Sequence, residues 1–429
     1  MTVTVSTLAN GMRVATDEMK DVETVSLGYW VGVGTRDEIP AQNGVAHLCE
    51  HMVFKGTPSN SARAIAEAIE NVGGHMNAYT SREQTAFYAK VLAADAGLVV
   101  DVLADMLQNA SLDPSELERE RGVVLQEIAE ANDTADDRVF DNFQSVTFPE
   151  QPLGLPILGD ADSVKSLQAG DISAWLGSHY QPASVIAVAA GKISHGQFRA
   201  LVEQNYRTQH HRAAESSPAH RASQFVGGHA SEIRQEIEQN HLVIGFPSVN
   251  ALDPRYYGYN IFSTILGGGM SSRLFQEVRE QRGLVYSIYS FMAAYRDSGI
   301  IGIYAGSGVE SLGELLPVVS QQLVSLTESI TEVELDRAKA QIRAGLLMAR
   351  ESTGNRAETL AQHLITYNRV KPMAEVLAAI DRVTIAELHE IGAQILGSAF
   401  SLATVGPANP DFSCAEVFAQ SLAEFHRAA

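Results

Sequence analysis

The pattern of apolar and polar residues is clearest at the start of the chain. Residues 2–18 (TVTVSTLANGMRVATDE) alternate between the two classes on either side of Asn10 and Gly11. Strict alternation is typical of a strand with one buried face, and an Asn-Gly pair between two such runs is typical of a tight hairpin turn. The sequence therefore begins with a predicted β-hairpin.

The two halves of the chain carry the same order of patterns. Each half has a predicted strand, then a helical segment, then a pair of strands, then two long helices. In the first half the strand, helical segment and strand pair are residues 24–38, 44–57 and 75–92, and in the second half they are residues 241–249, 256–269 and 284–308. This order indicates an internal repeat.

The last helices of the two halves align without gaps at an offset of 218 residues. The segment SLDPSELERERGVVLQE ends at Glu127, and SITEVELDRAKAQIRAG ends at Gly345. The alignment pairs Glu116 with Glu334 and Leu117 with Leu335. We therefore predict an α+β protein made of two homologous α/β-sandwich domains, each an antiparallel-rich sheet covered by helices on a shared βαββαα plan.

One polar stretch separates the two halves. Residues 208–224 (TQHHRAAESSPAHRASQ) contain Pro218 and show no apolar periodicity, which is typical of a linker. We expect an N-terminal domain at residues 1–207 and a C-terminal domain at residues 225–429.

Composition and charge exclude several classes of protein. The 429 residues carry 31 Lys and Arg against 51 Asp and Glu, a formal net charge of -20, which argues against a nucleic-acid-binding protein. No run of 18 apolar residues predicts a membrane span, and the first residues do not resemble a signal peptide. The two cysteines, Cys49 and Cys414, suggest no disulfide framework and fit a reducing compartment. We therefore expect a cytoplasmic protein.

The repeat also reveals where the halves differ. Glu120 aligns with Ala338 and Glu127 aligns with Gly345, and the second half has no counterpart of HLCEH at residues 47–51. If both halves share one fold, these acids and histidines are not needed to build it. Their presence in one half only indicates a chemical role.

The HLCEH segment has the spacing of a metal site. His47 and His51 are four residues apart, so they lie on one face of a helix, and Glu50 lies at the edge of that face. Two histidines and a carboxylate form a known catalytic zinc site with an open position. Glu127 is the candidate third ligand, and Glu120, two turns earlier on the same helix, is the candidate partner of a ligand histidine.

The same residues also fit an ordinary interpretation. A chain with 13 histidines can contain HxxEH by chance on a core helix. Glu120 and Glu127 taken singly fit solvated acids on an exposed helix face.

Several longer motifs extend beyond the HLCEH segment. HLCEHMVFKGT is followed by Glu127 in ERERGVVLQE, 76 residues after His51. Further motifs are GGHMNAYTSREQTAFY (73–88), LGGGMSSRLF (266–275) and RGLVYSIYS (282–290). Together they resemble the pitrilysin family of zinc peptidases, the inverzincins, and within it the mitochondrial processing peptidase β subunit and its bacterial homologues. The resemblance covers nearly the whole chain.

The resemblance implies a zinc metalloendopeptidase with one Zn²⁺ per chain. Its ligands would be His47, His51 and Glu127, with Glu50 as general base and Glu120 bound to a ligand histidine. It also implies that two residues of the second half stabilise the oxyanion of the reaction, namely Arg282 and Tyr286.

The resemblance further implies how peptides bind. Substrate would add as a β-strand beside the segment from Asn77 to Thr80, which includes Ala78 and Tyr79. This mode reads backbone and accepts unfolded or presequence-like peptides. Phe54 would line the pocket just after the scissile bond. Asp137 and Asp141, four apart, would share a helix face and bind an arginine near the cut.

Family members enclose substrate in a chamber of four such domains, so a dimer is implied. A homodimer is expected because one chain carries both halves of the machinery, and a heterodimer with an inactive homologue is the other arrangement. The alternative function is a non-catalytic peptide-binding or core-type subunit of the same family. The complete HxxEH, Glu127, Arg282 and Tyr286 favour the peptidase.

Overall fold

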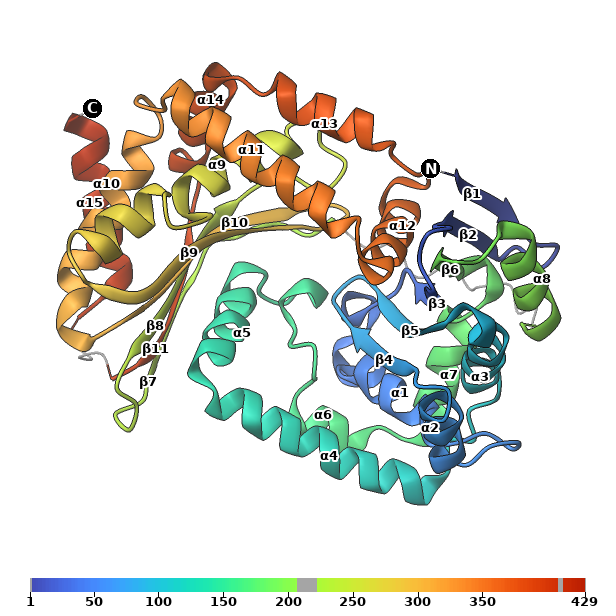
Figure 1. Cartoon of the computed structure of the whole chain (residues 1–429). Coiled ribbons are helices and arrows are strands. Elements are labelled where there is room, and N and C mark those ends of the chain that lie inside the picture. The colour runs from blue at the N-terminus through green and yellow to red at the C-terminus, as the bar shows by residue number, and fades with distance from the viewer. Residues whose placement is uncertain (1, 207–221, 408–411, 429) are drawn as a thin grey trace. The chain divides into compact units, whose positions relative to one another are not determined.

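The computed structural model describes residues 2–206, 222–407 and 412–428 (Figure 1). The chain divides into two compact units. Unit 1 comprises Met1–Ala129, Leu155–His220 and Leu347–Val370, and unit 2 comprises Glu130–Gly154, Arg221–Leu346 and Lys371–Ala429. The chain therefore crosses from one unit to the other both inside helices and in the segments that connect helices.

Unit 1 is built on a six-stranded mixed sheet in the order β1-β2-β6-β3-β5-β4. The predicted hairpin is confirmed, because β1 pairs antiparallel with β2 and Gly11 in the turn has a φ of 90°, which glycine adopts readily. Only β2 and β6 are parallel. The strands are β1 (Thr2–Thr7), β2 (Arg13–Glu18), β3 (Thr24–Val31), β4 (His75–Thr80), β5 (Thr85–Leu92) and β6 (Val185–Gly191).

Both faces of the central strands of this sheet are buried. Along β3, Val25, Leu27 and Tyr29 point into a core formed with the helices of one face, whereas Trp30 points to the other face. This is the two-residue period of a strand. The helices on the first face are α1 (Val45–Val53), α2 (Ala62–Glu70), α3 (Ala96–Asn109), α4 (Pro114–Asp133), α6 (Ala161–Ser166), α7 (Ala169–His179) and α8 (His195–Asn205).

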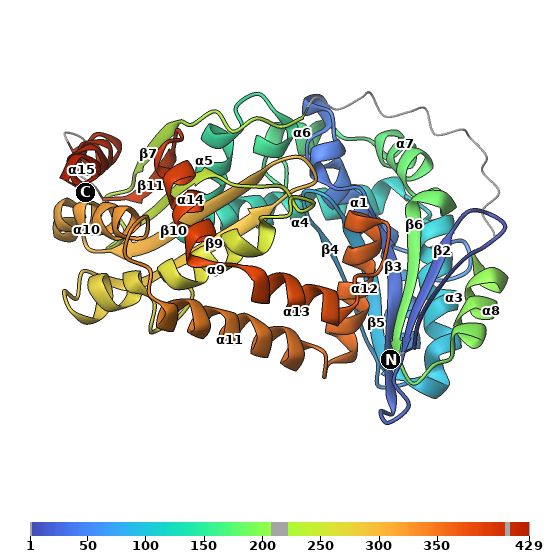
Figure 2. The same cartoon turned by 90° about the horizontal axis from the view of Figure 1, so that it is seen from above.

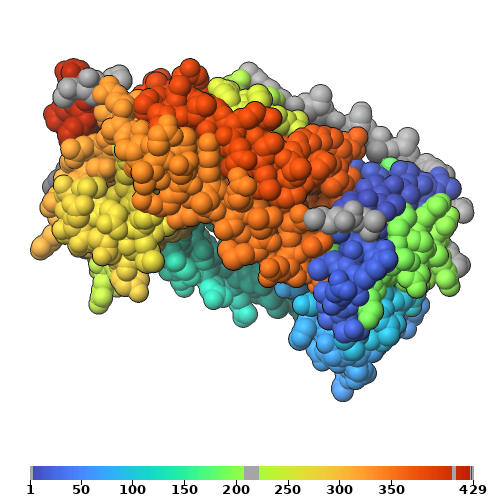
Figure 3. All heavy atoms as spheres, turned by 45° about the horizontal axis from the view of Figure 1, so that its top comes forward, coloured from blue at the N-terminus to red at the C-terminus, as the bar shows by residue number. Residues whose placement is uncertain are grey.

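The N-terminal strands are tied to α8 through a histidine on that helix. His195 lies within hydrogen-bond distance of both Ser6 and Thr16, at 2.8 and 3.0 Å. Figure 3 shows the corresponding blue and green surfaces lying against each other in unit 1.

Unit 2 contains a five-stranded sheet in the order β7-β11-β8-β10-β9. Its strands are β7 (His229–Ile233), β8 (Asn240–Pro247), β9 (Val285–Ala294), β10 (Gly299–Ser307) and β11 (Ser401–Gly406). One face packs on α9 (Tyr256–Gly267), a π-helix (Phe275–Glu280), α10 (Leu312–Ser325), α11 (Glu332–Ala349), α13 (Met373–Arg382), α14 (Ile385–Leu396) and α15 (Cys414–Ala428).

The repeat predicted from the sequence is confirmed by the strand order. Apart from β1, the strands of unit 1 and unit 2 correspond one to one, with one parallel pair followed by three antiparallel pairs in each sheet. The protein is therefore an α+β protein with two homologous layered sheets, as expected.

The remaining face of each sheet is covered by a helix from the other half of the sequence. In unit 1 this is α12 (Thr353–Tyr367), and in unit 2 it is α5 (Ala135–Thr147). Figure 2 shows α12 lying along the strands of unit 1. The starts of α5 and α12 are 218 residues apart, the same offset that aligns α4 with α11. The repeat thus extends to α5 and α12, the two helices that cover the sheet of the other half of the sequence.

Apolar and polar contacts both fix α12 on its sheet. Leu360 and Leu364 pack against a layer that contains Trp30, Ile186 and Val188. Polar contacts lie around this layer, and they are Ser26 Oγ to Thr353 Oγ1 at 2.9 Å, Arg356 to Asp17 at 3.0 Å and Arg13 to the carbonyl of Leu364 at 2.9 Å. The zinc-binding half expected from the sequence is therefore completed by residues 347–370.

The predicted division at residues 208–224 stays a prediction, since residues 207–221 lie outside the described part of the chain. Within the described ranges, no helix combines the length and the apolar character needed to cross a membrane.

The role of α12 as the cover of the second face of the unit 1 sheet can be tested by folding experiments. A fragment of residues 1–207 lacks α12 and leaves Trp30, Ile186 and Val188 uncovered. Burying each such side chain contributes about 1.5–3 kcal/mol, against a total stability of about 5–15 kcal/mol for a domain. We expect no cooperative thermal transition for this fragment in calorimetry.

The matched sample is the same fragment joined through a flexible linker to residues 347–370, which should regain a cooperative transition. Leu360→Asp with Leu364→Asp in the added segment should abolish the gain. A fragment 1–207 that melts as sharply as the full chain would show that α12 is dispensable.

Candidate metal centre

Helix α1 carries HLCEH, and a buried carboxylate holds its N-terminus. Glu38 is 2% exposed and accepts hydrogen bonds from the backbone N–H of Gly44 and Ala46 at 3.0 and 2.8 Å, and from Asn43 Nδ2 at 2.8 Å. Burial raises the pKa of Glu38 to about 7 although these donors oppose the shift. The first turn of α1 is thereby anchored independently of any metal.

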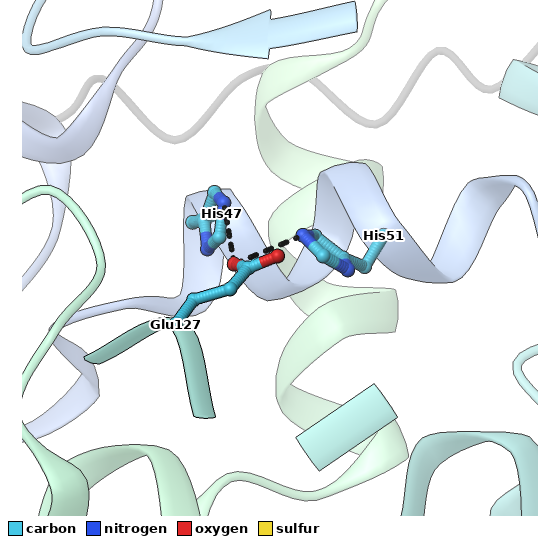
Figure 4. Close-up of side chains that lie close together, drawn as sticks. All are labelled: His47, His51 and Glu127. Carbon is cyan, nitrogen blue, oxygen red and sulfur yellow. Dashed lines mark ion pairs between the residues drawn. The ribbon is translucent and has the colours of Figure 1, made fainter. Parts of the chain in front are cut away.

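Three side chains converge between α1 and α4 (Figure 4). Oε2 of Glu127 lies 3.7 Å from His47 Nε2 and 3.6 Å from His51 Nε2, and the three candidate ligand atoms lie within 4.8 Å of one another. The imidazole centroids are 4.7 Å apart. The structure thus brings together all three residues that the sequence suggested as ligands.

The donor set fits a zinc ion. Two nitrogens and one carboxylate oxygen are the ligand types of catalytic zinc sites. Ligand atoms at normal zinc distances around a tetrahedral ion are about 3.4 Å apart, close to the two distances between Glu127 and the histidines. A fourth position remains for water or substrate.

His51 is held by a chain of charged side chains. Its Nδ1 lies 3.1 Å from Oε2 of Glu120, whose Oε1 lies 2.7 Å from Nζ of Lys55. Glu120 is only 6% exposed, which shows that it is not a solvated surface acid. A hydrogen bond from Nδ1–H leaves the lone pair on Nε2 of His51, the atom that faces Glu127.

The second histidine lies in a drier environment. Burial, with a smaller contribution from His51, lowers the pKa of His47 to about 4, so its imidazole is neutral at pH 7. Its Nδ1 is buried and has no hydrogen-bond partner among the described residues. Because the unfolded chain takes up a proton at higher pH than the folded metal-free chain, His47 reduces metal-free stability as the pH falls from about 6.5 to about 4.

Glu50 occupies the position of a proton acceptor. It precedes His51 on α1, and its Oε2 accepts a hydrogen bond of 2.5 Å from Oγ1 of Thr80 on β4. Burial raises the pKa of Glu50 above its ordinary value, while Thr80 and His51 oppose the shift. A carboxylate whose pKa is raised by burial is a stronger proton acceptor than an exposed one, and the hydrogen bond from Thr80 fixes its position.

A cavity of about 260 Å³ adjoins these side chains within unit 1. It is lined by Glu50, His51, Phe54, Lys55, Met76, Asn77, Ala78 and Glu120. The structure therefore places the predicted substrate residues Phe54, Asn77 and Ala78 beside the candidate base.

Tyr79 lies differently from these neighbours. Its side chain belongs to the apolar layer under α12, on the face of the sheet opposite α1, and its hydroxyl is 2.6 Å from Glu358. Its backbone belongs to β4, which among the described strands pairs with β5 alone.

The other four predicted residues belong to unit 2. Asp137 and Asp141 lie on α5, as expected from their spacing. Arg282 binds Glu277 at 2.7 Å in the turn before β9, and Tyr286 on β9 is 77% exposed. The hydroxyl of Tyr286 makes no hydrogen bond to the described residues.

Sequence reasoning gave no role to several residues of the site. Lys55 follows His51 by four residues, so helical spacing alone could have found it. Thr80 was part of the expected substrate strand, but its bond to Glu50 depends on how β4 crosses α1. Glu38 and Glu358 had no signal in the sequence.

Comparisons with known proteins agree with this arrangement. Residues 13–161 match the family model for insulinase, peptidase family M16, and residues 166–342 match the model for the M16 inactive domain. An uncharacterised zinc protease of Streptomyces coelicolor is 36% identical over 412 residues, 95% of this chain and 90% of that protein. Another from Bacillus subtilis is 34% identical, over 94% of this chain and 97% of that protein.

Solved structures show the same fold. A protease from Helicobacter pylori has a TM-score of 0.88 at 20% identity, covering 94% of this chain and 99% of that one. A chain of complex III from Candida albicans has a TM-score of 0.85 at 19% identity, covering 98% of this chain and all of that one.

Proposed function

The chain belongs to peptidase family M16, the pitrilysin family of zinc proteases, and from this premise we propose that it is an endopeptidase that cuts extended peptides added as a strand to β4. It is a zinc protease by its relatives and by its His–His–Glu cluster.

The observation that carries the proposal is the free edge of β4 beside the candidate base. Among the strands that the structure describes, β4 pairs with β5 alone, so its other edge offers backbone groups that no described strand uses. Met76, Asn77 and Ala78 from this strand line the same cavity as Glu50 and His51. A peptide paired with this edge would run past the reactive carboxylate, and recognition through backbone accepts varied unfolded sequences.

The chain's own residues then have defined tasks. One zinc ion per chain, held by His47, His51 and Glu127, would polarise water and the scissile carbonyl. Glu50 accepts the proton of the attacking water and passes it to the leaving amine. Thr80 orients Glu50, and Glu120 keeps the hydrogen of His51 on Nδ1. Phe54 contacts the residue that follows the cut.

Residues of unit 2 extend the proposal. The exposed, unbonded hydroxyl of Tyr286 and the guanidinium of Arg282 are suited to stabilise the oxyanion. Asp137 and Asp141 are suited to bind an arginine near the cut. We infer a homodimer that encloses the peptide, with an inactive homologue as the alternative partner. The cytoplasmic location stays a prediction.

The experiment is digestion of a mixed peptide library, with cleavage sites read by mass spectrometry. We expect internal cuts that stop when a zinc chelator is added and resume when Zn²⁺ is restored. Arginine should be enriched at one position near the cut, and Asp137→Asn with Asp141→Asn should remove this enrichment while cutting continues. Cutting that persists unchanged under chelation would contradict a zinc-dependent mechanism.

A further inference from the structure

A single carboxylate on α12 collects four hydrogen bonds on the face of the unit 1 sheet opposite the cavity. Oε2 of Glu358 accepts from Trp30 Nε1 at 2.9 Å. Its Oε1 accepts from the Tyr79 hydroxyl at 2.6 Å, Gln84 Nε2 at 3.2 Å and Gln362 Nε2 at 2.9 Å. All four partners are donors, and the side chain of Glu358 uses both of its oxygens as acceptors.

These bonds join two strands that are not neighbours. Trp30 lies on β3 and Tyr79 on β4, and β5 runs between them in the sheet. Trp30 is 2% exposed and is fixed in the layer under α12. Among the described strands, β4 forms backbone pairs with β5 alone. Glu358, on α12, therefore connects the edge strand β4 to the buried central strand β3.

Strand β4 links this hydrogen-bond network to the cavity on the opposite face of the sheet. Thr80, which donates to Glu50, is the next residue after Tyr79. Successive side chains of a strand point to opposite faces, so the two residues act on the two sides of the sheet. A shift of β4 at Tyr79 displaces the Thr80 hydroxyl and the edge on which Asn77 and Ala78 lie.

We propose that Glu358 is a positioning residue that holds β4, through Tyr79 and Gln84, in the place where a substrate strand can pair with it and where Thr80 meets Glu50. Glu358 touches neither the metal ligands nor Glu50. It acts 279 residues away in sequence from Tyr79, on the helix contributed by the second half of the chain. The inference rests on the proposed function, because it assigns a task to the strand that would bind substrate.

The chemistry of the pair suits this task. Burial and the nearby Glu358 raise the pKa of the Tyr79 phenol, so it stays a hydrogen-bond donor at any ordinary assay pH. Its oxygen also accepts a hydrogen bond of 2.6 Å from Gln84 Nε2, so Tyr79, Gln84 and Glu358 form a closed network of hydrogen bonds. A glutamine at position 358 would place its N–H₂ group opposite at least one of the donors, and that hydrogen bond would be lost.

The test compares Tyr79→Phe, Glu358→Gln and the control Gln362→Ala. Gln362 binds the same carboxylate but belongs to α12 and does not contact β4 through this network. Hydrogen exchange of the backbone at residues 75–80 reports on the strand directly. The Kd of a long fluorescent peptide, measured in the Glu50→Gln background to prevent turnover, reports on strand addition.

We expect Tyr79→Phe and Glu358→Gln to speed exchange at residues 75–80 but not at residues 45–53. Peptide Kd should rise about tenfold, as for loss of one hydrogen bond to a charged group. Zinc content should stay unchanged. The double variant should be no worse than either single variant, since both break one connection. Gln362→Ala should resemble the parent.

Unchanged exchange and unchanged Kd in both variants would overturn the proposal. Equal loss of protection across α1, or loss of zinc, would also overturn it, because the effect would then be general destabilisation. If the parent neither binds nor cuts peptides, the proposed function fails by itself. The exchange measurement would still decide whether Glu358 holds β4.

Discussion

Replacing Glu50 by glutamine is expected to remove almost all peptidase activity while the fold and the zinc content persist. The amide has the shape of the carboxylate and can still accept the hydrogen bond from Thr80, but it cannot take a proton at neutral pH. A positioned general base contributes about a hundred- to ten-thousand-fold to the rate, so kcat should fall by that factor.

The measurement is the initial rate on an internally quenched peptide, with zinc determined by atomic spectroscopy and folding by circular dichroism. Glu67→Gln is the matched control, because Glu67 is an exposed glutamate on α2 that forms an ion pair with Arg63 of the same helix. It should behave as the parent. Substantial turnover by a Glu50→Gln preparation, free of parent protein, would mean that another group accepts the proton.

Replacing Glu127 by alanine is expected to reduce bound zinc from about one ion per chain to a small fraction. Two histidines alone leave an incomplete ligand set, and a catalytic site needs three protein ligands to hold its ion. Loss of the ion also removes the stability that ligand binding gives to the folded state. Activity and the zinc-dependent rise in melting temperature should therefore disappear together.

Glu130→Ala is the control, since Glu130 is an exposed residue three positions later on α4 and lies outside the cluster. Both proteins would be dialysed against the same zinc-buffered solution before metal analysis. Full zinc retention in Glu127→Ala would show that the third ligand is a different residue.

The local chemistry of the site could be predicted because it depends on spacing within single elements. His47, Glu50 and His51 lie on one helix, where a separation of four residues determines which side chains share a face. Glu120 and Glu127 were separated from ordinary surface acids by their lack of counterparts in the second half. The structure shows Glu120 buried and bonded to His51, and Glu127 beside both histidines.

The repeated architecture could also be predicted, since alternation and helical periodicity follow the chain in order. The corresponding strand orders of the two sheets confirm this part of the expectation. Contacts between distant segments have no such local signal. The bond from Thr80 to Glu50 and the bond from Lys55 to Glu120 depend on the angle at which two elements cross.

The sequence by itself determined the α+β class, the internal repeat and the cluster of His47, His51 and Glu127. Only the tertiary structure decided that α5 and α12 each cover the sheet formed by the other half of the sequence and that Glu358 reaches Tyr79. The physical reason is the apolar second face of each sheet, which must be covered. Periodicity shows that such a face exists, but any amphipathic helix could cover it. Which helix does so depends on packing between segments that are hundreds of residues apart in the sequence.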